Sequence, residues 1–130
     1  MNSKDLKAWH RNQNGLGTLF GYFSIESTHS KKPLLTLEDI GRVVTLTDSA
    51  TVGLGRPGDR IVGVLRDIRD DYAVVQIAGL ALVNIDSIDP LYVGGPVAVG
   101  GRGGVVCTSS AYSSALFSYD EIDKKGIIKI

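Results

Sequence analysis

Short apolar runs, separated by turns rich in glycine and aspartate, make up most of the chain after residue 36. The runs are RVVTLT (42–47), RIVGVLR (60–66), YAVVQIA (72–78), LALVNI (80–85), PVAV (96–99), GVVCT (104–108) and a C-terminal IIKI. Many short strands at close spacing, joined by such turns, are typical of all-β barrels and sandwiches. No segment between them is long enough for the crossover helix of a parallel sheet. The pattern therefore predicts a small, compact all-β domain, barrel-like or sandwich-like, over residues 34–130.

The segment before this domain, residues 1–33, differs in composition. It contains many polar residues and both histidines, yet its LGTLFGYFSIES stretch is rich in aromatic and aliphatic side chains. Polar disordered tails rarely carry that aromatic content. We predict an extended N-terminal arm that contacts a partner or a neighbouring subunit. The candidate partner-binding residues are Trp9, Leu16, Leu19, Phe20, Tyr22, Phe23 and Ile25. The alternative is that LGTLFGYFSIES forms a first strand that packs on the domain's own core.

Local signals add detail to the predicted domain. TLEDIG predicts one helical turn that Thr36 caps, with Asp39 reaching back to it. In YAVVQIA the alternation places Val75 and Ile77 on one face of a strand, and Gly79 permits a sharp bend into the next strand. VGGPVAVGGRGGVV has the form of a β-hairpin. The serine-rich stretch CTSSAYSSALFSYDEID predicts a surface loop.

GLGRPG, Gly53 to Gly58, matches the G-x-G-x-x-G pattern that binds the pyrophosphate of a dinucleotide. That site needs a strand before the glycines and a helix after them, because phosphate binds the free N–H groups at the helix N-terminus. Here the following residues, including Ile61 and Val62, are β-branched and favour a strand. Pro57 also lacks a backbone donor, and residues 76–82 contain no acid to bind a ribose. We therefore interpret GLGRPG as a turn between two strands.

Charge and cysteine content narrow the partner classes. The 130 residues contain 14 basic and 14 acidic side chains, so the formal net charge is zero. A nucleic-acid binder usually has a basic excess, so we expect no nucleic-acid partner. The one cysteine, Cys107, excludes an internal disulfide framework. No apolar run reaches the length of a membrane span, so we expect no membrane partner and a protein synthesised in a reducing cytoplasm.

Candidate catalytic and metal-binding groups are few. His10 and His29 both lie in the N-terminal segment, and no G-x-S-x-G elbow is present for a serine nucleophile. Cys107 lies in an apolar run, where a buried, inert thiol is expected. The aspartates of RDIRDD are interleaved with Arg66 and Arg69 and lack calcium-loop spacing, so this stretch predicts a solvated turn. We expect no enzyme activity, no cofactor and no metal site.

Three strand and turn patterns follow one another in a fixed order: an I-x-G-V strand, a V-x-V-x-G strand, and a G-x-P-V segment with a glycine turn and a G-x-V-V return. The residues concerned are Ile61, Gly63, Val64, Val75, Ile77, Gly79, Gly95, Pro96, Val97, Gly104, Val105 and Val106. This order resembles the small head-decoration, or cement, proteins of tailed bacteriophages. The resemblance covers residues 40–108.

The resemblance implies a structural virion protein that binds the outer surface of a phage capsid and stabilises the shell. It implies a homotrimer at threefold positions, with the major capsid protein as partner and with no catalysis or cofactor. The N-terminal arm would then supply the contacts to the capsid protein or the next subunit. Two alternatives stay open: a β-barrel binding module of another assembly, such as a tail or baseplate component or a carbohydrate-binding domain, and a small hydrolase.

Overall fold

The protein is all-β, as its sequence pattern predicts. The computed structural model describes residues 18–86, 92–100, 104–108, 110 and 112–130. One 3-10 turn, η1 (Leu37–Asp39), accompanies ten strands in the described part of the chain. The strands are β1 (Leu19–Ile25), β2 (Val43–Asp48), β3 (Thr51–Gly53), β4 (Gly63–Arg69), β5 (Tyr72–Ala78), β6 (Leu80–Asn84), β7 (Val97–Val99), β8 (Val105–Cys107), β9 (Ala115–Asp120) and β10 (Lys125–Lys129).

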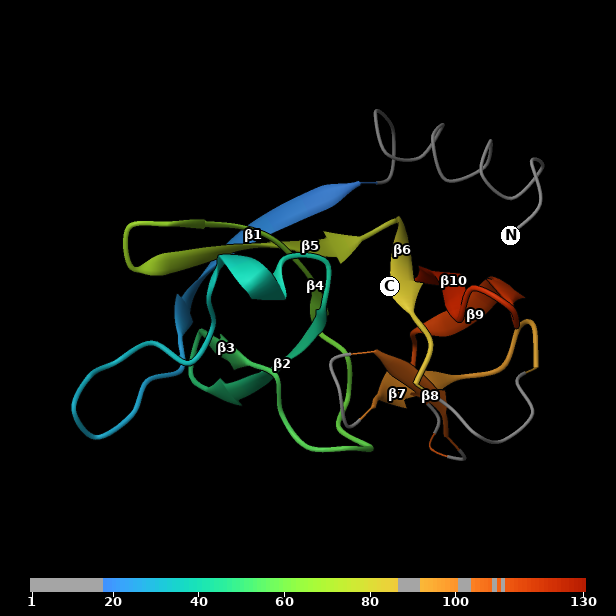
Figure 1. Cartoon of the computed structure of the whole chain (residues 1–130), viewed down its shortest axis with the longest axis horizontal. Coiled ribbons are helices and arrows are strands. Elements are labelled where there is room, and N and C mark those ends of the chain that lie inside the picture. Colours follow the sequence, from blue (N-terminus) through green and yellow to red (C-terminus); the bar gives the residue numbers. More distant parts are fainter. Residues whose placement is uncertain (1–17, 87–91, 101–103, 109, 111) are drawn as a thin grey trace.

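The first five strands close into a barrel in the order β1-β3-β2-β4-β5 (Figure 1). All of its ladders are antiparallel except the short parallel pairing of β1 with β3. The predicted helical turn is present as η1, and the Asp39 carboxylate accepts a hydrogen bond from the Thr36 backbone N–H at 2.8 Å. The solvated turn predicted for RDIRDD is confined to Asp70 and Asp71, which are exposed, with Asp70 at a φ of 53°; the four residues before them belong to β4.

The remaining strands form two small sheets beside the barrel, with the orders β6-β10-β9 and β7-β8 (Figure 1). Gly79, at a φ of 95°, makes the predicted bend from β5 into β6. The predicted hairpin is the antiparallel β7–β8 pair, and Cys107 lies in β8 as expected. Within the described residues, no helix is long and apolar enough to cross a membrane.

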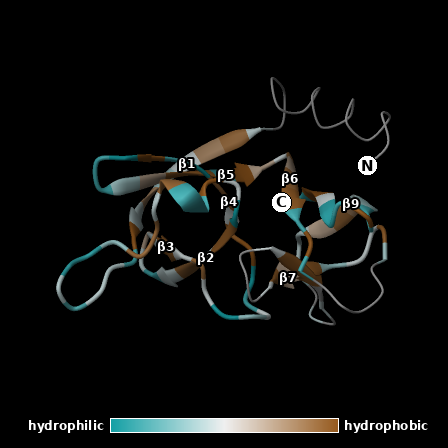
Figure 2. Cartoon of the chain, viewed as in Figure 1, coloured by the Kyte–Doolittle hydropathy of each residue, from teal (hydrophilic) through white to brown (hydrophobic). Residues whose placement is uncertain are grey.

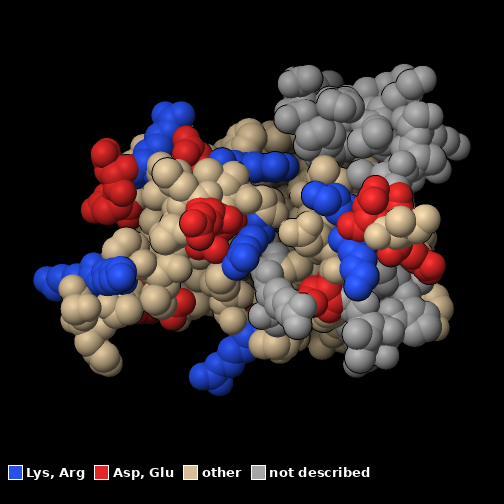
Figure 3. Space-filling view, viewed as in Figure 1, with Lys and Arg blue, Asp and Glu red and all other residues tan. Residues whose placement is uncertain are grey.

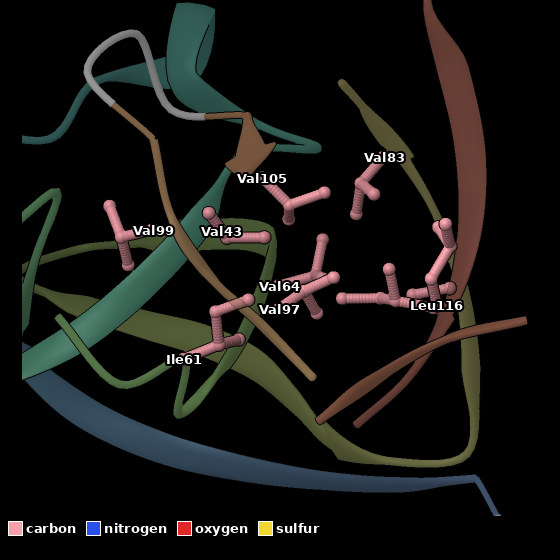
Figure 4. Packing of buried hydrophobic residues seen from close by; sticks show 10 residues of the cluster. Val43, Ile61, Val64, Val83, Val97, Val99, Val105 and Leu116 are labelled. Atoms are coloured by element: carbon pink, nitrogen blue, oxygen red, sulfur yellow. The ribbon is translucent and has the colours of Figure 1, made fainter. Parts of the chain in front are cut away.

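Two hydrophobic clusters hold these parts together. One lies inside the barrel and contains Leu35, Val44, Val52, Leu65, Ala73 and Val75. The other joins the barrel to the two C-terminal sheets and contains Val43, Ile61, Val64, Ala81, Val83, Val97, Val99, Val105, Leu116 and Ile128. Figure 4 shows side chains from the barrel side of this second cluster, such as Val43 and Val64, among side chains of the C-terminal strands, such as Val97 and Val105. We call it the junction cluster.

The junction cluster explains why several runs are apolar at consecutive positions. Successive residues of a strand point to opposite faces. Val44 and Leu65 therefore face the barrel interior, while their neighbours Val43 and Val64 face the C-terminal sheets. All four side chains are fully buried. A barrel wall that is covered on both faces needs apolar residues on both faces.

The N-terminal boundary differs from the prediction. Of the predicted arm, residues 1–33, the segment Leu19–Ile25 is β1 of the barrel, paired with β5 along its length and with β3 at its end. This is the alternative that the sequence left open, a first strand that packs on the domain's own core. Its partly buried Phe23 and Ile25 fill the barrel interior, which gives the physical reason. Residues 1–17, with Trp9, His10 and Leu16, lie outside the described residues.

Two strands were not predicted. Thr51–Gly53 forms β3, a strand only 3 residues long that ends in the glycine-rich stretch. The surface loop predicted for the serine-rich stretch is wrong over Ala115–Asp120, which forms β9. There Leu116 and Ser118 are buried, and the strand pairs with β10. Small polar side chains on the buried face obscured an alternation that is otherwise typical of a strand.

The interpretation of GLGRPG as a turn is confirmed. It connects β3 to β4, and its Gly55 and Gly58 adopt φ values of 70° and 93° that other residues rarely adopt. The Gly58 N–H donates to the Val99 carbonyl at 2.8 Å, which holds the turn against β7. A strand follows the glycines where a dinucleotide site would need a helix.

Candidate interaction surface on β1

The predicted partner-binding residues divide between the two faces of β1. Phe23 and Ile25 point inward and pack against the barrel core. Leu19, Phe20 and Tyr22 are exposed, with 56%, 48% and 71% of their surface accessible. The alternation of the strand therefore assigns Phe23 and Ile25 to the core and leaves Phe20 and Tyr22 available to a partner. Leu19 lies beyond a register irregularity between Leu19 and Phe20 and is exposed as well.

The exposed face continues onto β5. Val74 lies directly opposite Tyr22 in the β1–β5 ladder, and Tyr72 lies opposite Ser24. The Tyr22 and Tyr72 rings meet edge to face, with centroids 5.5 Å apart and an interplanar angle of 81°. We call Leu19, Phe20, Tyr22, Tyr72 and Val74 the β1 face. Sequence reasoning missed its β5 members, although the alternation of YAVVQIA places Tyr72 and Val74 on one side.

The β1 face lies beside an open strand edge. The Ser24 N–H donates to the Ala50 carbonyl on the β3 side, at 2.8 Å. Because backbone groups alternate in direction along an antiparallel strand, those of Tyr22 and Phe20 also point away from β5. β3 pairs with β1 only at Ser24 and Ile25. Among the residues that the structure describes, no strand lies along Tyr22 and Phe20 on that side.

The strand that forms this edge lacks the charged side chains and the proline that commonly prevent edge pairing. Proteins protect open edges with charged side chains, proline or a covering element. The sequence of β1, LFGYFSI, contains neither a charged residue nor a proline. Figure 2 shows the N-terminal part of β1 as a hydrophobic (brown) strand on the outside of the barrel. The geometry favours the docking of an extended, apolar segment, with main-chain hydrogen bonds along the edge.

Titratable groups elsewhere form structural pairs. Arg69 Nε donates to Asp67 Oδ2 at 3.0 Å, and the Ile68 N–H donates to Asp67 Oδ1. These bonds, that from Arg69 first, lower the pKa of the Asp67 carboxyl below its ordinary value. Both groups lie near the end of β4, before the exposed β4–β5 turn. His29 is exposed, and the described residues contain no cluster of His, Cys, Asp or Glu able to hold a metal ion.

Arg66 contacts a buried amide, whereas Arg69 pairs with a carboxylate. The sequence pattern does not distinguish the two arginines. Its guanidinium donates to Gln76 Oε1 from Nε at 2.9 Å and from Nη2 at 2.6 Å. Gln76 is only 2% exposed, although it lies in an otherwise apolar strand. A glutamine inside an apolar run is the sequence signal that could have revealed this buried polar contact.

Comparison with known proteins gives no relative from which a role could be transferred. No protein-family model, no curated protein sequence and no solved structure matches the chain significantly.

Proposed function

We propose that this chain is a structural virion protein that binds the outer surface of a tailed-phage capsid and stabilises the shell. In this proposal it acts as a homotrimer at threefold positions, with the major capsid protein and itself as partners. The sequence resemblance to head-decoration proteins supplies the partner. The observation that supports an attachment role is the β1 face, an uncharged aromatic surface beside an open strand edge.

The chemistry of the β1 face suits a protein that holds large neighbours together. An extended segment that pairs with a strand edge gains main-chain hydrogen bonds, and its apolar side chains gain by burial against Phe20 and Tyr22. A trimer makes three such contacts at once, so each modest contact is strengthened by effective concentration. Zero formal net charge lets many copies lie close together on one shell without strong repulsion.

A carbohydrate-binding module is the other function that the exposed aromatic residues could serve. A sugar ring stacks best on aromatic side chains that are co-planar or line a groove. Tyr22 and Tyr72 meet nearly at right angles, at 81°, and form no such platform. This geometry favours a protein partner over a sugar, whether on a capsid or, as the alternative, in a tail or baseplate.

The test is co-sedimentation of the purified protein with mature heads of the phage that encodes it, prepared without this protein. We expect binding to saturate at a fixed number of copies per capsid, equal to three for each threefold position. Heads that bind the protein should also withstand heat or low salt better than undecorated heads. Failure to pellet with heads, or binding that does not saturate, would contradict the proposal and direct attention to tail components.

A further inference from the structure

A polar groove of about 460 Å³ lies where the barrel meets the C-terminal sheets. The charged and amide side chains that line it come from η1, β4, β6, β10 and the residue before β2: Glu38, Arg66, Asn84, Lys125 and Arg42. Figure 3 shows basic (blue) and acidic (red) side chains close together on this face of the molecule. Its volume lies within the range of small-ligand pockets in proteins. None of these residues belongs to the β1 face.

Arg66 is directed to this groove by an irregularity in β4. In the β4–β5 ladder Leu65 pairs with Val75 and Asp67 pairs with Val74, so Arg66 is the extra residue of a β-bulge. A bulge re-aims a side chain and often occurs at functional sites. Here it separates Arg66 from Arg69, which pairs with Asp67 at the exposed end of β4.

Gln76 holds the guanidinium of Arg66 in place. Its Nε2 donates to the Ala78 carbonyl at 3.1 Å and to the Leu80 carbonyl at 2.9 Å, which fixes the direction of its Oε1 atom. That oxygen accepts from Nε and Nη2 of Arg66. A guanidinium has five N–H donors, so the edge formed by Nη1 and Nη2 retains free donors. This edge has the geometry that binds a carboxylate through two parallel hydrogen bonds.

Arg66 and Arg42 differ in their ion pairing within the described residues. Among the described residues, no carboxylate lies within ion-pair distance of it, whereas Arg42 pairs with Asp39 at 3.2 Å. Partial burial lowers the pKa of Arg66 from its ordinary value, and an arginine still stays protonated at neutral pH. A half-buried cation held by a neutral amide gains free energy from an anion that enters the groove.

The charges around the groove indicate which anion fits. Arg42, Arg66 and Lys125 supply the positive charge, while Glu38 and the Arg42-bound Asp39 offset part of it. These five side chains together carry one net positive charge. A monoanion neutralises this charge, whereas a dianion such as phosphate would leave a net negative charge in the groove. We propose that this groove is a binding site for a single carboxylate group, anchored by the free guanidinium edge of Arg66 and assisted by Lys125. This site is independent of the β1 face and of the capsid assignment.

NMR spectroscopy of the whole ¹⁵N-labelled chain tests the site. The probes are a blocked tripeptide with a central glutamate, the same peptide with a central glutamine, sodium acetate and inorganic phosphate. We expect the glutamate peptide to shift the Arg66 Nε–H signal and the Gly41 and Asn84 amides saturably, with millimolar affinity that weakens as salt is added. The glutamine peptide should leave these signals unchanged. Equal binding of acetate would identify a free carboxylic acid as sufficient, whereas weaker binding of acetate would identify a peptide carboxylate; both results support the site.

Variants separate binding from folding. Lys125→Ala should raise the Kd about two- to fivefold, as expected for one exposed charge, and Lys129→Ala on the same strand should leave it unchanged. Arg66→Lys keeps the charge but loses the two-pronged donor edge, and should raise the Kd about tenfold or more. If Arg66→Lys is misfolded, the comparison of Lys125→Ala with Lys129→Ala tests the proposal in its place. Equal shifts with both peptides, shifts that do not include the groove signals, or tighter binding of phosphate than of the glutamate peptide would overturn the proposal.

Discussion

The barrel and the C-terminal sheets of this protein differ in how they bury their apolar residues. The barrel has its own interior cluster, which includes Leu35, Val52 and Leu65. The described residues of the C-terminal sheets contribute to the junction cluster, which also needs Val43 and Val64 of the barrel. The barrel therefore has a core of its own, while the C-terminal sheets share theirs with the barrel wall.

This difference shows how a small chain can leave one barrel strand available to a partner. The β2 and β4 side of the barrel is covered by the C-terminal sheets through the junction cluster. Within the part of the chain that the structure describes, the outer face of β1 has no such cover, and Phe20 and Tyr22 remain exposed there. A stable barrel interior can hold β1 in place without burying its outer face. We therefore predict that substitutions in the junction cluster destabilise the whole fold, whereas substitutions on the β1 face do not.

The largest expected effect is loss of all tertiary structure in an isolated fragment of residues 80–130. The fragment would lack Val43, Ile61 and Val64, on which its apolar side chains pack. Its own small sheets bury too little surface to offset the entropy of ordering the chain. Circular dichroism and NMR dispersion should show an unfolded chain, with the full-length protein as the folded control. Cooperative thermal unfolding of the fragment would contradict the comparison.

Large-to-small substitutions compare the two clusters within the intact chain. Leu65 lies in the barrel cluster and Leu116 in the junction cluster, and both are fully or almost fully buried. Each change to alanine should lower the free energy of unfolding by about 2–5 kcal/mol, through lost burial and an unfilled cavity. Denaturant unfolding followed by both far-UV circular dichroism and the NMR amide signals of residues in each cluster should show one transition in each variant. Two separate transitions in Leu116→Ala would mean that the C-terminal sheets unfold independently.

The smallest effect concerns the Asp67–Arg69 pair at the exposed end of β4, which belongs to neither cluster. The hydrogen bond from Arg69 lowers the pKa of Asp67 in the folded protein. The contribution of this carboxylate to stability is therefore present above its unfolded pKa, near 4, and is lost as the pH falls through the lower folded value. Asp67→Asn should therefore slightly lower the stability at pH 7, make no difference once the Asp67 carboxyl of the parent protein is protonated, and so slightly reduce the loss of stability below about pH 4. Thermal unfolding between pH 2 and pH 7 measures this, and an unchanged acid limb would contradict it.

Local sequence signals predicted much of the fold. The capped turn at Thr36, the bend at Gly79 and the glycine turn before β4 each depend on residues close together in sequence. The alternation in LFGYFSI also contained the division of β1 into two faces, but it did not reveal that the strand belongs to the barrel. That membership depends on pairing with β5, about fifty residues later in the chain. Long-range pairing of this kind leaves no local signal in a single sequence.

The candidate sites were less predictable than the fold. The exposed aromatic residues of β1 were identifiable as a group, although Phe23 belongs to the core. The groove could not be predicted, because Arg42, Arg66 and Lys125 are brought together only when the C-terminal sheets pack beside the barrel. Within RDIRDD the sequence also gave no reason to separate Arg66 from Arg69. The β-bulge makes that separation, and a bulge depends on the register of the partner strand.

The central claim, attachment through the β1 face, is tested most directly by one binding comparison on undecorated phage heads. The variant carries Phe20→Ser with Tyr22→Ser, and a matched control carries Leu46→Ser with Ile122→Ser, two apolar residues exposed elsewhere. Both proteins should keep the thermal transition of the parent chain. We expect the β1 variant to bind heads about tenfold or more weakly, as for residues central to an interface, and the control to bind normally. Equal binding by both variants would contradict the claim.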